Sequence, residues 1–167
     1  NHETAAMNRA YGFAREAADK YGAAVAALFT ETFAALPLAH VLGGRVFVVH
    51  GGLPARTPPD AASIDELQQL DRFGQPADDS PVADLLWSDP QAQAGLRPSP
   101  RGVGALFGPD VTQAFLARNG LRLVIRSHEA VSTGYALAHD GLLATVFSAP
   151  NYCDVLGNVG AYATLTA

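Results

Sequence analysis

Three short stretches of the sequence carry side chains that could bind a metal ion. The chain begins with Asn1-His2-Glu3, and two later apolar, β-branched runs each end in a histidine, His50 and His128. Such a run predicts a buried strand that delivers one side chain at its end, where a sheet meets solvent. Neutral imidazoles suit a transition metal, and an amide carbonyl can complete the site. The sequence therefore predicts a metal centre formed by Asn1, His50 and His128.

Between Asn1 and His50 the sequence predicts two helices and a strand. Helical spacing of apolar residues predicts one helix over 5–20 and a second over 23–36, which Pro37 ends. A turn at Gly43-Gly44 precedes a strand predicted over 46–50.

The rest of the chain is expected to contain short helices, a long loop and strands. Ser63 and Glu66 have the spacing of a capping box, which predicts the start of a short helix. Residues 73–104 are expected to be irregular. Asp110 is expected to cap a helix that runs to Arg118. Four strands are expected to form a β-meander, with a hairpin turn between the second and the third; they cover 121–127, 134–139, 142–147 and 160–166. The predicted class is α/β (α+β).

Composition narrows the function classes. The chain has 167 residues, 49% of them hydrophobic and 16% charged, which is typical of one globular domain or a large piece of one. A net charge of −5 argues against a nucleic-acid partner, and no apolar run is long enough for a membrane span. Cys153 is the single cysteine, so no internal disulfide can form, and a cytoplasmic or nuclear location is expected.

Several motifs, in order along nearly the whole chain, resemble the phosphoprotein phosphatase family of metal-dependent serine/threonine phosphatases. The motifs are Asn1-His2-Glu3, His50-Gly51-Gly52, Leu85-Leu86-Trp87-Ser88-Asp89-Pro90, Arg101-Gly102-Val103, Arg126-Ser127-His128-Glu129 and Ser148-Ala149-Pro150-Asn151-Tyr152-Cys153. The resemblance implies a metallophosphoesterase-type β-sandwich flanked by helices. It also implies that residues 1–167 form the C-terminal part of a catalytic domain whose N-terminal half is absent.

The resemblance assigns roles to individual residues. It implies two divalent metal ions (Mn²⁺ in vitro, with Fe or Zn as alternatives), of which this chain supplies the ligands of one through Asn1, His50 and His128. His2 is then the general acid that protonates the leaving alkoxide. The residues implied to contact the substrate phosphate are Asn1, His2, Arg101, His128 and Tyr152.

Other polar residues have plainer interpretations. Arg126 and Glu3 are expected to be structural, and Trp87 and Asp89 are expected to fix the long loop. Gly51-Gly52 is expected to let the backbone turn where a Cβ would obstruct.

The expected partners are phosphoprotein substrates and a regulatory domain or subunit. Two alternatives remain open: an inactive partial domain or interaction module, and a phosphoesterase that acts on small molecules. As an isolated piece, the chain is expected to expose sheet edges and to associate or dissolve poorly.

Overall fold

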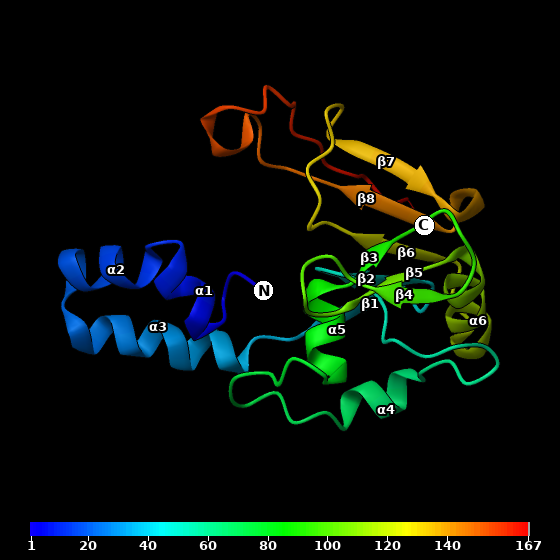
Figure 1. The fold of residues 1–167 in the computed structure, drawn as a ribbon, viewed down its shortest axis with the longest axis horizontal. Helices are drawn as coiled ribbons and strands as arrows, with labels where there is room; N and C mark the ends of the chain where they lie inside the picture. The colour runs from blue at the N-terminus through cyan, green and yellow to red at the C-terminus, as the bar shows by residue number, and fades with distance from the viewer. Residues whose placement is uncertain (167) are drawn as a thin grey trace.

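A computed structural model describes residues 1–166 and confirms the α/β class (Figure 1). The helices are α1 (Ala5–Ala10), α2 (Phe13–Tyr21), α3 (Ala23–Ala35), α4 (Ile64–Gln68), α5 (Pro81–Trp87) and α6 (Pro109–Asn119), with 3₁₀ turns η1 (His139–Gly141) and η2 (Tyr152–Asp154). The strands are β1 (Ala39–Leu42), β2 (Val46–Val49), β3 (Asp89–Pro90), β4 (Leu96–Pro98), β5 (Ala105–Phe107), β6 (Leu123–Arg126), β7 (Tyr135–Ala138) and β8 (Leu143–Val146). No helix in this part of the chain is long and apolar enough to cross a membrane.

The larger sheet places the ends of two strands side by side. Its order is β1-β2-β6-β8-β7, with β2, β6 and β8 parallel to one another and the outer strands antiparallel to their neighbours. Val48 of β2 lies opposite Ile125 of β6. Because parallel strands end at the same edge of a sheet, His50 and His128 leave the sheet at neighbouring points.

The smaller sheet, in the order β3-β5-β4, shares one hydrophobic core with the larger sheet. Alternating side chains of β2 and β6 are buried, as a half-buried strand requires. Phe47 of β2 packs against Phe115 of α6 with ring centroids 4.9 Å apart, and Phe107 of β5 is fully buried in the same cluster. The burial of each such side chain stabilises the fold by about 1.5–3 kcal/mol.

The prediction of a single helix over 5–20 is wrong, because the structure has two helices there, α1 and α2. Gly12 adopts a φ of 90° and separates α1 from α2, because a left-handed residue cannot continue a right-handed helix. Helices α2 and α3 then form a hairpin that projects from the sheets on the left of Figure 1. Phe13, Phe29 and Phe33 pack within this hairpin, with centroids 5.3–5.9 Å apart.

The long segment over 73–104 is also more regular than predicted. It contains α5, β3 and β4. Ser80 caps α5 by accepting a hydrogen bond from the Ala83 backbone at 3.2 Å, and Pro81 occupies the first turn. Leu85 of this helix is buried in the core, so packing decides the structure of a segment whose composition indicates a loop.

Three further predictions about elements are wrong. The strands after α6 do not form a meander, because β6 pairs with β8 and β7 lies at the outer edge. A strand was predicted over 160–166, but within the described residues this segment carries none. Strand β1, in turn, was not predicted. Asp110 does not cap α6, because the N-cap of this helix is Gly108. The carboxylate of Asp110 instead accepts a hydrogen bond from the Gly95 backbone at 2.8 Å.

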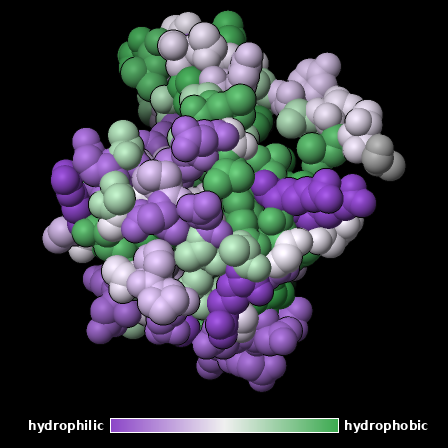
Figure 2. Space-filling model, turned by 90° about the vertical axis from the view of Figure 1, so that its right-hand side faces the viewer, coloured by the Kyte–Doolittle hydropathy of each residue, from purple (hydrophilic) through white to green (hydrophobic). Residues whose placement is uncertain are grey.

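Other predictions about elements are confirmed. Helix α3 and strand β2 lie where the sequence places them, Ser63 and Glu66 form the capping box of α4, and His139–Gly141 makes the turn between β7 and β8. Figure 2 shows hydrophobic residues at the surface in the upper part of the molecule, where Figure 1 places β7. Tyr135 and Leu137 of β7 are exposed by 58% and 66%.

Candidate metal centre and phosphate site

The three predicted metal ligands lie together. The Oδ1 atom of Asn1 is 2.7 Å from Nε2 of His50, which is 3.2 Å from Nδ1 of His128. Asn1 is buried just before α1, and the two histidines follow β2 and β6. Residues from three distant parts of the sequence therefore direct one oxygen and two nitrogen atoms at a common point.

Backbone contacts fix the two histidines. The Ser127 amide donates to the His50 carbonyl at 3.0 Å and extends the pairing of β2 with β6 past the strand ends. The Gly51 amide donates to the Leu85 carbonyl at 2.9 Å, which draws the chain against the end of α5. A Cβ at Gly51 would lie 2.5 Å from the Leu86 carbonyl carbon, so this glycine is required by space, as the sequence predicted.

Burial keeps both imidazoles neutral. It is the largest cause that lowers the pKa of His50 to about 3 and the pKa of His128 to about 4. The nearby Arg101 guanidinium lowers the pKa of His128 further. A neutral imidazole is the form that binds a metal ion, so both side chains are ready to act as ligands near neutral pH.

The geometry of this cluster fits a metal ion. Metal–ligand distances of about 2.1 Å put two ligands at right angles about 3 Å apart, close to the 2.7 Å and 3.2 Å that separate Nε2 of His50 from Asn1 and from His128. Within residues 1–166, no three His, Cys, Asp or Glu side chains gather at one point, so Asn1 is needed to complete this set. Nε2 of His128 is buried and has no hydrogen-bond partner among these residues, so Nδ1 is the His128 atom engaged with the cluster.

His2 lies beside the three predicted ligands. Its ring stacks on Tyr11 with centroids 5.1 Å apart and meets His50 edge-on at 6.4 Å. The Asn8 side chain donates a hydrogen bond to the His2 carbonyl and anchors the backbone there. Partial burial is the largest cause that lowers the pKa of His2. The place of Tyr11 beside His2 was not predicted, because no motif in the sequence marks this stacking contact.

Arg101 is held near the cluster by an acidic residue. Its Nε donates to Oδ2 of Asp89 at 2.6 Å, while Oδ1 of Asp89 accepts from the buried Arg126 at 2.7 Å. Asp89 thus fixes the loop that carries Arg101, in line with the expectation for this residue. The neighbouring cavity of about 430 Å³ is lined by Arg101, Trp87 and Met7, among others.

Tyr152 is not brought into this cluster by direct contact within the described residues. It begins η2 and packs its ring against Phe147 with centroids 5.1 Å apart, and its backbone amide donates a hydrogen bond to Oδ1 of Asn158 in the same loop at 2.8 Å. Figure 1 shows η2 above α1, on the same side of the molecule as the N-terminus. Its predicted role in phosphate binding stays a prediction.

The comparisons with known proteins decide the family. The calcineurin-like phosphoesterase family matches residues 1–132. The chain belongs to this family. It is 51% identical over 97% of its length to "Serine/threonine-protein phosphatase 5" from Solanum lycopersicum and from Homo sapiens, and it spans 29% and 32% of those proteins.

A solved structure supports the same relationship. It is a protein serine/threonine phosphatase from Saccharomyces cerevisiae, described as similar to human phosphatase PP5. The two folds agree with a TM-score of 0.89 at 45% identity, over 95% of this chain and 49% of the yeast chain. The predicted resemblance and the metallophosphoesterase-type fold, represented by its C-terminal part, are confirmed.

Proposed function

We propose that this chain takes part in hydrolysing phosphoserine and phosphothreonine in proteins. The observation that carries the proposal is the convergence of Asn1, His50 and His128 on one point. It occurs in a chain that is 51% identical to proteins named serine/threonine phosphatases. Because the chain spans about a third of those relatives, the activity is proposed for the protein that contains it.

The donor set has a defined part in this reaction. Asn1, His50 and His128 would hold one of two divalent metal ions, Mn²⁺ or an Fe or Zn ion. When bound, the ions polarise the phosphoryl oxygens and supply an activated water. Burial of the two imidazoles keeps them unprotonated, so they hold their positions without a competing proton.

Arg101 is proposed to bind the phosphate oxygens. Asp89 accepts the hydrogen bond from Nε of Arg101, so the two Nη groups are the donors left for phosphate. Asn1, His2, His128 and Tyr152 would complete the phosphate site. For Tyr152 this requires its loop to reach the substrate.

His2 is proposed to protonate the leaving oxygen of serine or threonine. Because its pKa is lowered from 6.5, His2 is mostly neutral at pH 7 in this chain. A general acid must carry its proton before the reaction, so this role requires a carboxylate close to the ring. Within residues 1–166, no carboxylate makes a hydrogen bond to the His2 ring.

The test is hydrolysis of p-nitrophenyl phosphate in the presence of Mn²⁺. Activity is expected to be lost with a chelator and in His2→Ala, and to persist in the control His40→Ala, which replaces an exposed histidine of β1. Activity that survives both the chelator and His2→Ala would refute the proposal. A protein that binds Mn²⁺ but hydrolyses nothing would instead favour the interaction-module alternative.

Substrate class is tested separately. Phosphopeptides and dinucleoside polyphosphates are compared under the same conditions, and faster hydrolysis of phosphopeptides is expected. The reverse preference would favour the small-molecule phosphoesterase. Phosphoprotein substrates and a regulatory region elsewhere in the protein are the proposed partners.

A further inference from the structure

A single buried arginine contacts three loops of the candidate site. The side chain of Arg126, at the end of β6, is wholly buried. Its Nε donates to the Gly51 carbonyl at 2.6 Å, its Nη1 to Oε2 of Glu129 at 2.8 Å, and its Nη2 to Oδ1 of Asp89 at 2.7 Å. Nη2 also donates to the Ser88 carbonyl at 3.2 Å.

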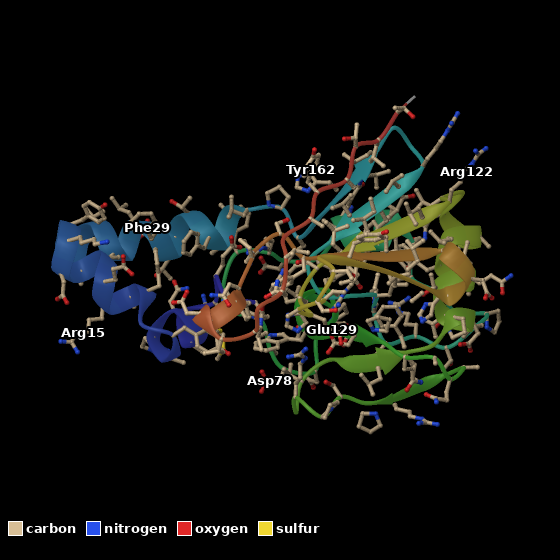
Figure 3. All side chains as sticks on the ribbon, turned by 90° about the horizontal axis from the view of Figure 1, so that it is seen from above. Arg15, Phe29, Asp78, Arg122, Glu129 and Tyr162 are labelled. Atoms are coloured by element: carbon tan, nitrogen blue, oxygen red, sulfur yellow. The ribbon has the colours of Figure 1, made fainter. Side chains whose placement is uncertain are left out.

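Three of the four partners of Arg126, Gly51, Glu129 and Asp89, are adjacent to, or in contact with, a proposed functional residue. Gly51 directly follows His50, and Glu129 directly follows His128. Asp89 holds Arg101 through its second carboxylate oxygen at 2.6 Å. Figure 3 shows Glu129 near the middle of the view, beside the sheets, whereas Arg15 lies at the far end of the helical hairpin; the Glu129 side chain itself is 41% exposed.

The guanidinium of Arg126 can hold the three loops in fixed positions relative to one another. Its nitrogen atoms lie in one plane at fixed angles, so hydrogen bonds from Nε, Nη1 and Nη2 fix their acceptors relative to one another. The buried positive charge of Arg126 is balanced by Asp89 and Glu129, and Asp89 is shared with Arg101. A flexible ammonium group cannot reproduce this planar arrangement.

We propose that Arg126 is a positioning residue that sets the distance between the metal-binding histidines and the phosphate-binding arginine. The hydrogen bond to Glu129 positions the loop that carries His128, and the hydrogen bond to Gly51 positions the loop that carries His50. The hydrogen bond to Asp89 positions Arg101. This inference rests on the proposed function for the identity of the ligands, and on the contacts of Arg126 for the coupling.

The three hydrogen bonds predict that variants of the network differ in their affinities for Mn²⁺ and for inorganic phosphate. Glu129→Gln is expected to weaken Mn²⁺ binding and to leave the affinity for inorganic phosphate at saturating Mn²⁺ nearly unchanged. Asp89→Asn is expected to weaken the binding of inorganic phosphate and to leave the affinity for Mn²⁺ nearly unchanged. Arg126→Lys is expected to weaken both, by roughly 10- to 100-fold for Mn²⁺, the usual effect of removing a group that orients a metal ligand.

A core variant controls for a general loss of stability. Phe115→Leu alters a buried side chain of α6 that makes no hydrogen bond to the Arg126 network. It is expected to lower the melting temperature while leaving both affinities unchanged. The inference is wrong if Arg126→Lys behaves like Phe115→Leu, or if all three network variants weaken the same affinity equally.

Histidine NMR of the metal-free protein separates this inference from the proposed function. Arg126→Lys is expected to shift the ring ¹⁵N signals of both His50 and His128, and Phe115→Leu neither. Unchanged ring signals in Arg126→Lys would overturn the positioning role even if Mn²⁺ binds normally. Wild-type protein that binds no Mn²⁺ would refute the proposed function, and the ring signals would still decide the role of Arg126.

Discussion

Arg101 depends on its guanidinium and not only on its charge. Arg101→Lys is expected to weaken inorganic phosphate binding about tenfold, because it loses at least one charge-assisted hydrogen bond of about 1.5 kcal/mol. The lysine would also lose the Nε–H donor that Asp89 now accepts at 2.6 Å. Inhibition by phosphate measures the effect, with Arg97→Lys on the exposed strand β4 as the control. Equal inhibition constants for wild type and Arg101→Lys would contradict the assignment.

Gly51 is limited by space, whereas Gly120 is limited by its backbone conformation. A methyl group at Gly51 meets the backbone of Leu86 and Trp87 at 2.5–2.6 Å, and one at Gly120 meets nothing but sits at a φ of 64°. Gly51→Ala is therefore expected to lower the free energy of unfolding by about 3 kcal/mol. Gly120→Ala is expected to cost about 1 kcal/mol.

Urea unfolding of the two glycine variants measures this difference. Gly51→Ala should also weaken Mn²⁺ binding, because the neighbouring His50 must shift. Similar unfolding free energies for both variants would show that the chain relaxes easily around Gly51.

At the scale of elements, His139 ties the β7–β8 hairpin to the rest of the fold. Its Nε2–H donates to the Gln91 carbonyl at 3.0 Å, and its Nδ1 accepts from the Thr112 hydroxyl of α6 at 2.8 Å. Burial lowers the pKa of His139 below 6.5, although the Gln91 carbonyl and the carboxylates of Asp110 and Asp140 oppose the shift. The folded state therefore prefers the neutral ring.

This preference predicts a pH dependence of stability. Below pH 6.5 the unfolded chain binds a proton at His139 more readily than the folded chain does, so the stability contributed by the neutral ring is complete above pH 6.5 and is lost as the pH falls. His139→Gln is expected to reduce the stability at pH 7.5 and to make its fall between pH 7 and 5 shallower. Urea unfolding at several pH values measures both, with the exposed His40→Gln as control. Parallel pH profiles for wild type and His139→Gln would exclude this contribution.

The sequence predicts those elements in which local pattern and packing agree. Strand β2 and helix α3 have clear periodicity, and Ser63 with Glu66 caps α4. The break at Gly12 is hidden because apolar residues continue at helical spacing on both sides of it. The strand order could not be predicted, because consecutive strands usually pair, and here β6 pairs with β8 while β7 lies outside it.

The same limit applies to the candidate site. The place of His50 and His128 could be predicted because each ends an apolar run, and parallel strands end together. The contacts of Arg126 with Asp89 and Gly51 span 37 and 75 residues. Such pairs depend on the three-dimensional packing of loops, which has no periodic signal in the sequence.

For the whole molecule, the outer strands of the larger sheet are the exposed edges. Strands β1 and β7 end the sheet within residues 1–166, and Val41, Leu42, Tyr135 and Leu137 on them are 41–66% exposed. Edges with unpaired backbone groups and apolar side chains promote association. We expect the 167-residue chain to self-associate with rising concentration.

Light scattering coupled to size-exclusion chromatography measures this association. Leu137→Lys on β7 is expected to reduce the association, and Leu156→Lys, at a leucine that is 56% exposed but lies outside the sheet, is not. A monomer at every concentration with one cooperative melting transition would contradict the expectation.

The parallel pairing of β2 with β6 also sets when the metal site can form during folding. His50 and His128 are separated by 78 residues, and Asn1 lies 49 residues before His50. Bringing such distant residues together carries a loop-closure cost that precedes any gain from their contact. The three ligands are therefore expected to assemble after the main folding barrier. Mn²⁺ should then slow unfolding and leave the refolding rate nearly unchanged, a difference that stopped-flow fluorescence of Trp87 can measure.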